Sequence, residues 1–182
     1  GFSTRHPHTA AALLAVAAAW PESVCCSDLL ALPPSSGPAD GVSVAPETLS
    51  QEEFIDVLRA LFLRGLVDLS AARVQCAQDA PECPAVSALN RIQAAKRAVV
   101  CNYHHQAVSM DAAGYPILEQ LDGQKTVGQI AERLLKAVRD GELAITHRDR
   151  PLLEAPDHVD ILNGFVRKHL QTMAQHALLA PP

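Results

Sequence analysis

The sequence has few aromatic residues: one tryptophan, two tyrosines and four phenylalanines among 182 residues. β-Sandwiches depend on aromatic and β-branched residues, whereas alanine and leucine, which dominate here, favour helices. The composition therefore predicts a mainly helical protein. Its length is sufficient for one good core or for two small cores side by side.

Long apolar runs are also missing. None reaches the roughly 18 residues that a membrane helix needs. The longest candidate, residues 10–20, is short and rich in alanine. The Trp20-Pro21-Glu22 sequence at its end does not resemble a signal-peptide cleavage site. We therefore expect a soluble, cytoplasmic protein without a membrane partner. The opening GFSTRHPHT lacks an initiator methionine, which indicates a domain taken from a longer or processed chain.

The motifs of the common enzyme classes are absent. The sequence has no HExxH, no glycine-rich phosphate loop and no strand, glycine-rich turn and helix of the kind that binds dinucleotides or S-adenosylmethionine. Cys101, His104 and His105 come nearest to a metal cluster, but adjacent residues of a strand point to opposite faces. We predict no catalytic, cofactor-binding or metal-binding residue in this chain, and expect that it is not an enzyme by itself. An enzyme with a His/Cys metal site is a third hypothesis.

The remaining histidines and cysteines receive structural interpretations. His6 and His8 flank Pro7 near the terminus, where we expect solvated side chains rather than a ligand pair. Cys25 and Cys26 are adjacent, too close for ordinary disulfide geometry. Cys76 and Cys83 could close a small disulfide loop in an oxidising compartment, although reduced thiols are favoured.

The best-defined pattern lies at residues 99–135. Residues 111–121 predict a short helix that includes Tyr115, and Gly123 can adopt the positive φ of a helix-ending turn. Thr126 and Gln129 form a capping box that opens an amphipathic helix. The inward stripe of this second helix comprises Val127, Ile130, Leu134 and Val138.

Similar patterns recur in both halves of the chain. The first half predicts an apolar helix at 10–20 that is covered on most of its circumference, a proline-rich loop at 33–46, a helix opened by a Ser50–Glu53 capping box, and a strand at 66–69. The second half predicts strands at 98–109 and 143–146. A last helix is capped by Asp157, with Val159, Leu162, Phe165, Val166, Leu170, Met173 and Ala177 pointing inward.

We interpret this order as mainly α with short β wings (α+β). Two tandem winged-helix-like units span residues 1–86 and 87–182, the second including the long C-terminal helix. Winged helices often bind DNA, but the helix at 50–64 carries two basic and three acidic residues and the helix at 127–140 carries three and two. Since the net charge of the chain is −5, protein contact is favoured over nucleic acid. A DNA-binding transcriptional regulator is the alternative.

Four sequence segments resemble, in the same order, the sequences of one known family. They are HTAAALLAVAAAWPESVCCSDLL, LRALFLRGLVDLS, SALNRIQAA and NYHHQAVSMDAAGYPILEQLDGQKTVGQIAERL. Together they resemble the C-terminal winged-helix or regulatory region of bacterial S-adenosylmethionine-dependent methyltransferases related to the rickettsial outer-membrane-protein lysine methyltransferases. In that family an asparagine, a basic residue and a histidine precede an extended valine segment; Asn102, His104 and His105 stand there in this chain. Nothing is carried over onto residues 147–182.

The resemblance implies a non-catalytic regulatory or substrate-docking domain that acts through protein–protein contacts. S-adenosylmethionine would be bound by a separate catalytic domain of the same chain, which is the expected partner, with a protein substrate or a second copy as further partners. We predict the partner surface at Asn102, Tyr103, His105 and Tyr115, near Val108. Core packing is the other role open to the two tyrosines.

Overall fold

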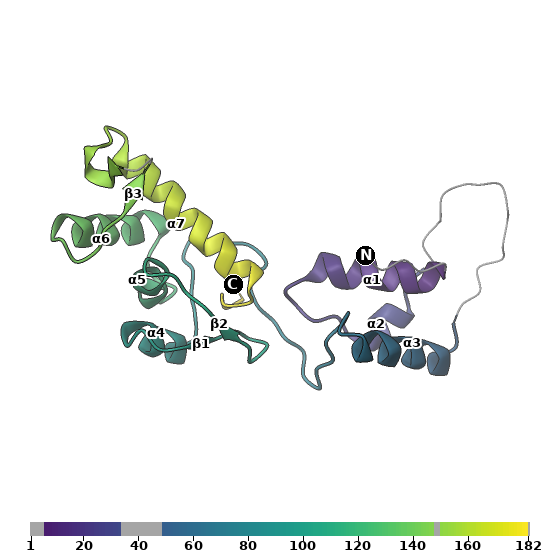
Figure 1. The fold of residues 1–182 in the computed structure, drawn as a ribbon. Helices are drawn as coiled ribbons and strands as arrows, with labels where there is room; N and C mark the ends of the chain where they lie inside the picture. The colour runs from purple at the N-terminus through teal and green to yellow at the C-terminus, as the bar shows by residue number, and fades with distance from the viewer. Residues whose placement is uncertain (1–5, 34–48, 148–149, 182) are drawn as a thin grey trace. The chain divides into compact units, whose positions relative to one another are not determined.

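The structure is a computed structural model that describes residues 6–33, 49–147 and 150–181. The chain divides into two compact units, residues 1–74 and 75–182 (Figure 1). The loop predicted at 33–46 lies outside the described residues, apart from Pro33. No helix in the described ranges is both long and apolar enough to cross a membrane.

The first unit consists of three described helices, α1 (Pro7–Ala19), α2 (Cys26–Leu30) and α3 (Gln51–Leu63). Their small core is built on Ala12, Leu29 and Phe54. The capping box predicted at the start of α3 is confirmed: the Glu53 backbone N–H donates to Ser50 Oγ at 3.3 Å, and the Ser50 N–H donates to the Glu53 carboxylate at 2.8 Å. The box satisfies two backbone donors that the first helical turn would otherwise leave unpaired.

Two expectations for the first unit are wrong, and a third is met only in part. Residues 66–69 form no strand, because no described segment pairs with them, and Leu66 and Leu69 are about half exposed. His8, Thr9 and Ala12 of α1 are buried and several further residues are partly buried, whereas the face with Leu14, Ala17 and Ala18 is exposed. His8 is 2% exposed instead of solvated, because its ring packs 5.4 Å from that of Phe54.

The second unit contains the rest of the secondary structure. Its helices are α4 (Ala88–Ala95), α5 (Gly114–Gln120), α6 (Val127–Arg139), a 3-10 turn (Leu152–Glu154) and α7 (His158–Gln175). Two antiparallel pairs join β1 (Val100–Cys101) to β2 (Ala107–Val108) and β3 (Thr146–His147) to β4 (Arg150–Pro151). The predicted class, mainly α with short strands, is confirmed.

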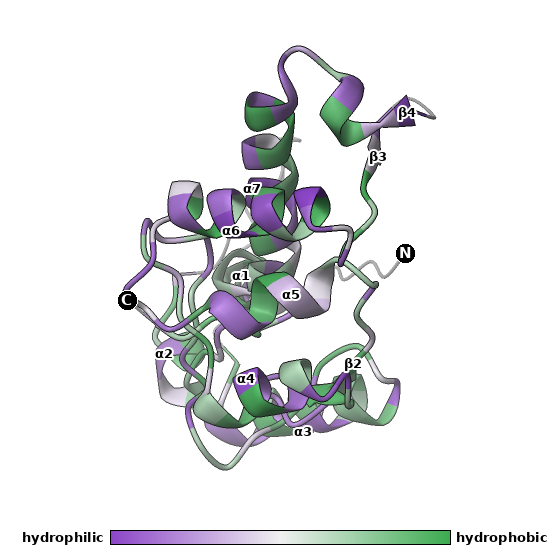
Figure 2. Ribbon diagram, turned by 90° about the vertical axis from the view of Figure 1, so that its left-hand side faces the viewer, coloured by the Kyte–Doolittle hydropathy of each residue, from purple (hydrophilic) through white to green (hydrophobic). Residues whose placement is uncertain are grey.

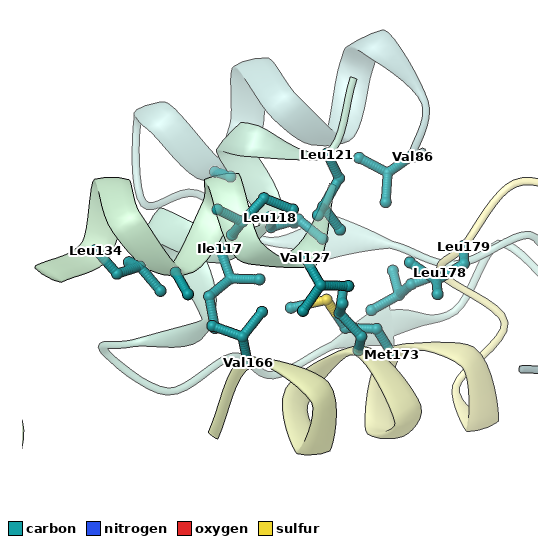
Figure 3. Close-up of a cluster of buried hydrophobic side chains, with 14 of the residues drawn as sticks. Val86, Ile117, Leu118, Leu121, Val127, Leu134, Val166, Met173, Leu178 and Leu179 are labelled. Carbon is teal, nitrogen blue, oxygen red and sulfur yellow. The ribbon is translucent and has the colours of Figure 1, made fainter. Parts of the chain in front are cut away.

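The core of the second unit lies where α5, α6 and α7 meet. Figure 3 shows Ile117 and Leu118 of α5 and Val127 of α6 gathered with Val166 and Met173 of α7. The Thr126–Gln129 capping box is confirmed by two hydrogen bonds of 2.9 and 3.3 Å. In Figure 2, hydrophilic and hydrophobic stretches alternate along α6, as expected of a helix with one buried stripe.

The segment before α4 belongs to the second unit. The Ala77 N–H donates to the Leu179 carbonyl at 3.1 Å, the Val86 N–H donates to the Leu121 carbonyl at 3.1 Å, and Ala85 forms a bridge with Asp122. These bonds attach residues 77–86 to the α5–α6 turn and to the C-terminal segment. The boundary between the units therefore falls after Val74 in the structure, whereas the sequence pattern predicts it after Val86.

The predicted strands are shorter in the structure. Residues 98–109 fold back as the β1–β2 hairpin, in which Val100 pairs with Val108. The strand expected at 143–146 is only Thr146–His147. Helix α7 begins after Asp157 as predicted, but the Asp157 side chain makes no capping hydrogen bond, and Val159, expected inside, is 49% exposed.

Candidate partner-binding surfaces

Asn102 builds the turn of the β1–β2 hairpin. Its side-chain oxygen accepts the N–H groups of His104 at 3.0 Å and Gln106 at 2.9 Å, and its side-chain nitrogen donates to Gln106 Oε1 at 3.2 Å. Its own N–H donates to the Gln106 carbonyl at 3.0 Å. The side chain is buried at 8% exposure, so its polar atoms serve the loop itself.

The other predicted surface residues lie in three different settings. His105 is exposed at the tip of this turn, in the left-handed region at φ +59°. The backbone N–H of Tyr103 donates to the Ala177 carbonyl at 2.9 Å, which joins the hairpin to the segment after α7. Burial, with a contribution from Cys76, raises the pKa of the Tyr103 phenol. Tyr115 is half-buried on α5 and packs against the core.

A hydrogen bond that sequence reasoning missed connects the start of α5 to α7. Asp111 Oδ1 accepts the Gly114 N–H at 2.6 Å at the start of α5, and Asp111 Oδ2 lies 3.1 Å from His169 Nε2 on α7. Partial burial raises the pKa of Asp111, but the bonds from His169 and Gly114 outweigh it, so the pKa lies below its usual value. The residues are far apart in sequence, and no local pattern indicates the pairing.

The cysteines and histidines do not converge on one place. None of the five cysteines, all of which lie in described residues, forms a disulfide; Cys25 and Cys26 are exposed and Cys76 is buried. No group of three or more His, Cys, Asp or Glu side chains with metal-binding geometry occurs in the part of the chain that the structure describes. The Cys101 backbone instead pairs with the Asn90 side chain, which donates to its carbonyl at 2.9 Å.

Two hollows, of about 470 and 360 Å³, flank the start of α6. Asp122 and Lys125 in the second hollow are paired with each other. The hydrogen bond from Lys125, together with the N–H of Gln124, lowers the pKa of Asp122 to about 2. These charges stabilise the turn before α6 and leave no free acid–base pair at that point.

The exposed side of α6 carries mixed charge. Lys136 Nζ lies 3.5 Å from the Asp140 carboxylate, and Arg133 donates to Gln120 Oε1 at 2.8 Å. Two of the three basic residues of the helix therefore have polar partners on the same exposed surface. Together with the acidic residues Glu132 and Asp140 of this stretch, these contacts leave little of the concentrated positive charge that a phosphate-binding helix presents.

Helix α1 of the first unit is apolar along its length. From Pro7 to Trp20 the helix carries no Asp, Glu, Lys or Arg. Leu14 is 67% exposed and Trp20 50% exposed, and Ala17 and Ala18 are also exposed. Leu14 lies two residues from the buried Ala12, about 200° around the helix. The side of α1 opposite its core contact is thus an exposed apolar stripe, and we name Leu14, Ala17, Ala18 and Trp20 the α1 surface.

Together, the fold and these surfaces define a small winged-helix module in the second unit and, in the first unit, a helix with an exposed apolar face. A family model described as "PKMT, C-terminal winged helix domain" matches residues 82–178, more than half of the chain. The chain belongs to this family, and the resemblance inferred from the sequence is confirmed. A search of curated proteins found no match.

Solved structures agree on the fold. A structure of PKMT2 from Rickettsia typhi in complex with AdoHcy matches 98% of this chain with a TM-score of 0.70 and 16% identity. A second PKMT2 structure from R. typhi matches 72% with a TM-score of 0.59 and 17% identity. At such identity the likeness concerns the fold alone. The matched region is 35% and 28% of those chains, so this chain spans about a third of their length.

Proposed function

We propose that this chain is a non-catalytic docking module of a bacterial S-adenosylmethionine-dependent methyltransferase of the protein-lysine type. In this proposal it acts in the cytoplasm through protein–protein contacts, and its first partner is the catalytic domain of the same polypeptide. The methyl donor is held by that domain and not by this one. The protein substrate is the second partner, approached through the neighbourhood of Tyr103, His105 and Tyr115.

The α1 surface is the observation that carries the proposal. A helix that is apolar on all sides is stable in water only when most of its circumference is covered. The first unit covers α1 on the side of Ala12 and leaves Leu14 exposed. In this proposal the cover is the part of the related polypeptides that this chain does not match; family membership and the length of the related chains support it.

The described residues do not fit a site for the donor. S-adenosylmethionine sites of the Rossmann type need parallel strands that lead through a glycine-rich turn into a helix. The described strands are two-residue antiparallel pairs. This mismatch supports a donor site in a separate domain, and the reading frame upstream of Gly1 should encode it.

The test is a binding measurement between this chain and that catalytic domain, expressed separately. Leu14→Glu places a charge on the α1 surface and should weaken binding by roughly tenfold or more, because burying a leucine contributes about 1.5–3 kcal/mol. Val159→Glu is the matched control, since Val159 is also an exposed aliphatic residue of a helix but belongs to α7. Circular dichroism of both variants verifies the fold.

The proposal is contradicted if both variants bind the catalytic domain as tightly as the parent chain does, or if the parent chain does not bind it. Sequence-specific DNA binding by the unmodified chain would favour the transcriptional regulator instead.

A further inference from the structure

One segment of the second unit differs in charge from the rest of the protein. Residues 83–110 contain no Asp or Glu, although the chain has twenty of them, and contain Arg91, Lys96 and Arg97. The segment thus carries a formal charge of +3 in a chain of net charge −5. It includes α4 and the β1–β2 hairpin.

The outward side of α4 is aliphatic. Asn90 and Ala94 face inward and are buried, and Ile92, between them in sequence, points the opposite way with 54% of its surface exposed. Leu89, 60% exposed, lies one turn before Ile92, and Lys96 lies one turn after it. Helix α5, which packs against α4, contributes one acid, Glu119.

The end of α4 extends this face. Val99, just before β1, is 62% exposed. Arg97 lies in the left-handed region at φ +50°, a position after a helix that glycine usually occupies. The chain therefore has an arginine at a backbone position that disfavours it, beside three exposed aliphatic residues. We name Leu89, Ile92, Lys96, Arg97 and Val99 the α4 surface.

We propose that the α4 surface binds an acidic amphipathic helix of a partner protein. Aliphatic side chains of such a helix would cover Leu89, Ile92 and Val99, and its flanking carboxylates would pair with Lys96 and Arg97. This is the recognition mode in which a helix uses residues at i, i+3 and i+7 as apolar anchors and charged residues as a rim. The inference does not depend on the docking of α1.

Charge complementarity favours this occupant over the alternatives. Nucleic acid would use the cations but leaves three exposed aliphatic residues without apolar contacts. An anionic membrane is usually bound by a longer amphipathic helix with aromatic anchors, whereas α4 has eight residues and no aromatic side chain.

The experiment uses the whole chain and four probes. The first is a short helical peptide with leucine at i, i+3 and i+7 and glutamate on both flanks, and the second is the same peptide with lysine for each glutamate. Phosphatidylglycerol-containing vesicles and a short DNA duplex are the third and fourth. We expect the glutamate peptide to bind and to shift the amide NMR signals of α4, and the lysine peptide to bind at least tenfold more weakly.

Two variants separate binding from folding. Arg97→Gly removes one cation and relieves the positive φ, so it should weaken binding of the glutamate peptide several-fold while the thermal midpoint stays equal or rises. Lys96→Glu should weaken binding of the glutamate peptide further, whereas Lys136→Glu, on the exposed side of α6, should leave that binding unchanged. The inference is overturned if the glutamate peptide fails to bind or if its shifts lie outside residues 88–99. It is also overturned if the lysine peptide binds equally well, or if only vesicles or DNA perturb residues 88–99.

Discussion

His8 is a polar ring in an apolar core. It is 2% exposed, packs against Phe54, and its Nδ1 atom has no hydrogen-bond partner among the described residues. Burying such an atom unpaired costs free energy, about 1–3 kcal/mol in typical proteins.

His8→Leu should therefore increase the stability of the first unit by about 1 kcal/mol. The measurement is urea unfolding followed by the fluorescence of Trp20, the single tryptophan, which lies in the same unit. His158→Leu is the control, and its unfolding is followed by far-UV circular dichroism because His158 lies in the second unit. Its Nδ1 lies 2.9 Å from the Ala155 carbonyl, so removing the ring should bring no gain. A loss of stability in His8→Leu would show that the ring makes a favourable contact.

Asn102 illustrates how a side chain can look functional and serve the fold. Asn102→Ala would leave the N–H groups of His104 and Gln106 without their acceptor, and we expect a loss of about 1–2 kcal/mol. Hydrogen exchange at these two amides should accelerate. Ser109→Ala, at an exposed position just after β2, should leave their exchange unchanged. Unaltered exchange in Asn102→Ala would mean that the turn holds without the side chain.

The sequence contains a local signal for this turn. Asparagine often bonds to backbone groups two residues ahead, as Asn102 does here. The prediction of one extended strand over residues 98–109 was wrong because Asn102 and His105 lie where the chain reverses. The Asp111–His169 pair had no such signal, because only the packing of α7 on α5 brings it together.

At the scale of elements, helix starts were predictable and strands were not. Ser50–Glu53 and Thr126–Gln129 are local hydrogen-bonding patterns, so three residues of spacing suffice to recognise them. A strand depends on a partner elsewhere in the chain. Residues 66–69 had the composition of a strand but no neighbour to pair with.

The stability of the turn between α5 and α6 should depend on pH. Asp122 has a pKa lowered to about 2, first by the Lys125 hydrogen bond. Because the folded pKa lies below the unfolded value of about 3.9, the carboxylate stabilises the fold above pH 4, and this contribution disappears as the pH falls toward 2.

Asp122→Asn should accordingly unfold at a lower urea concentration than the parent chain at pH 7, and the gap should close between pH 4 and pH 2. When Lys125 is already replaced by alanine, Asp122→Asn should lower the urea midpoint at pH 7 by less, because Lys125→Ala removes the main partner of the Asp122 carboxylate. A difference between parent and Asp122→Asn that stays constant across this range would show that the carboxylate charge contributes nothing.

At the scale of the whole chain, the family and the mainly helical class followed from the sequence. The exposure of α1 did not, because composition indicates that an apolar helix needs a cover but not which part of the protein provides it. The structure leaves the face of α1 with Leu14, Ala17 and Ala18 exposed. That exposed face is the reason for the proposal that a catalytic domain covers α1.

Trp20 offers the most direct measurement of this central claim. It ends α1, is half exposed and is the only tryptophan, so a chain labelled with fluorotryptophan gives one fluorine NMR signal. Adding the unlabelled catalytic domain should shift and broaden that signal in the parent chain and in Val159→Glu, and much less in Leu14→Glu. A signal that does not change while the two domains bind would contradict the account.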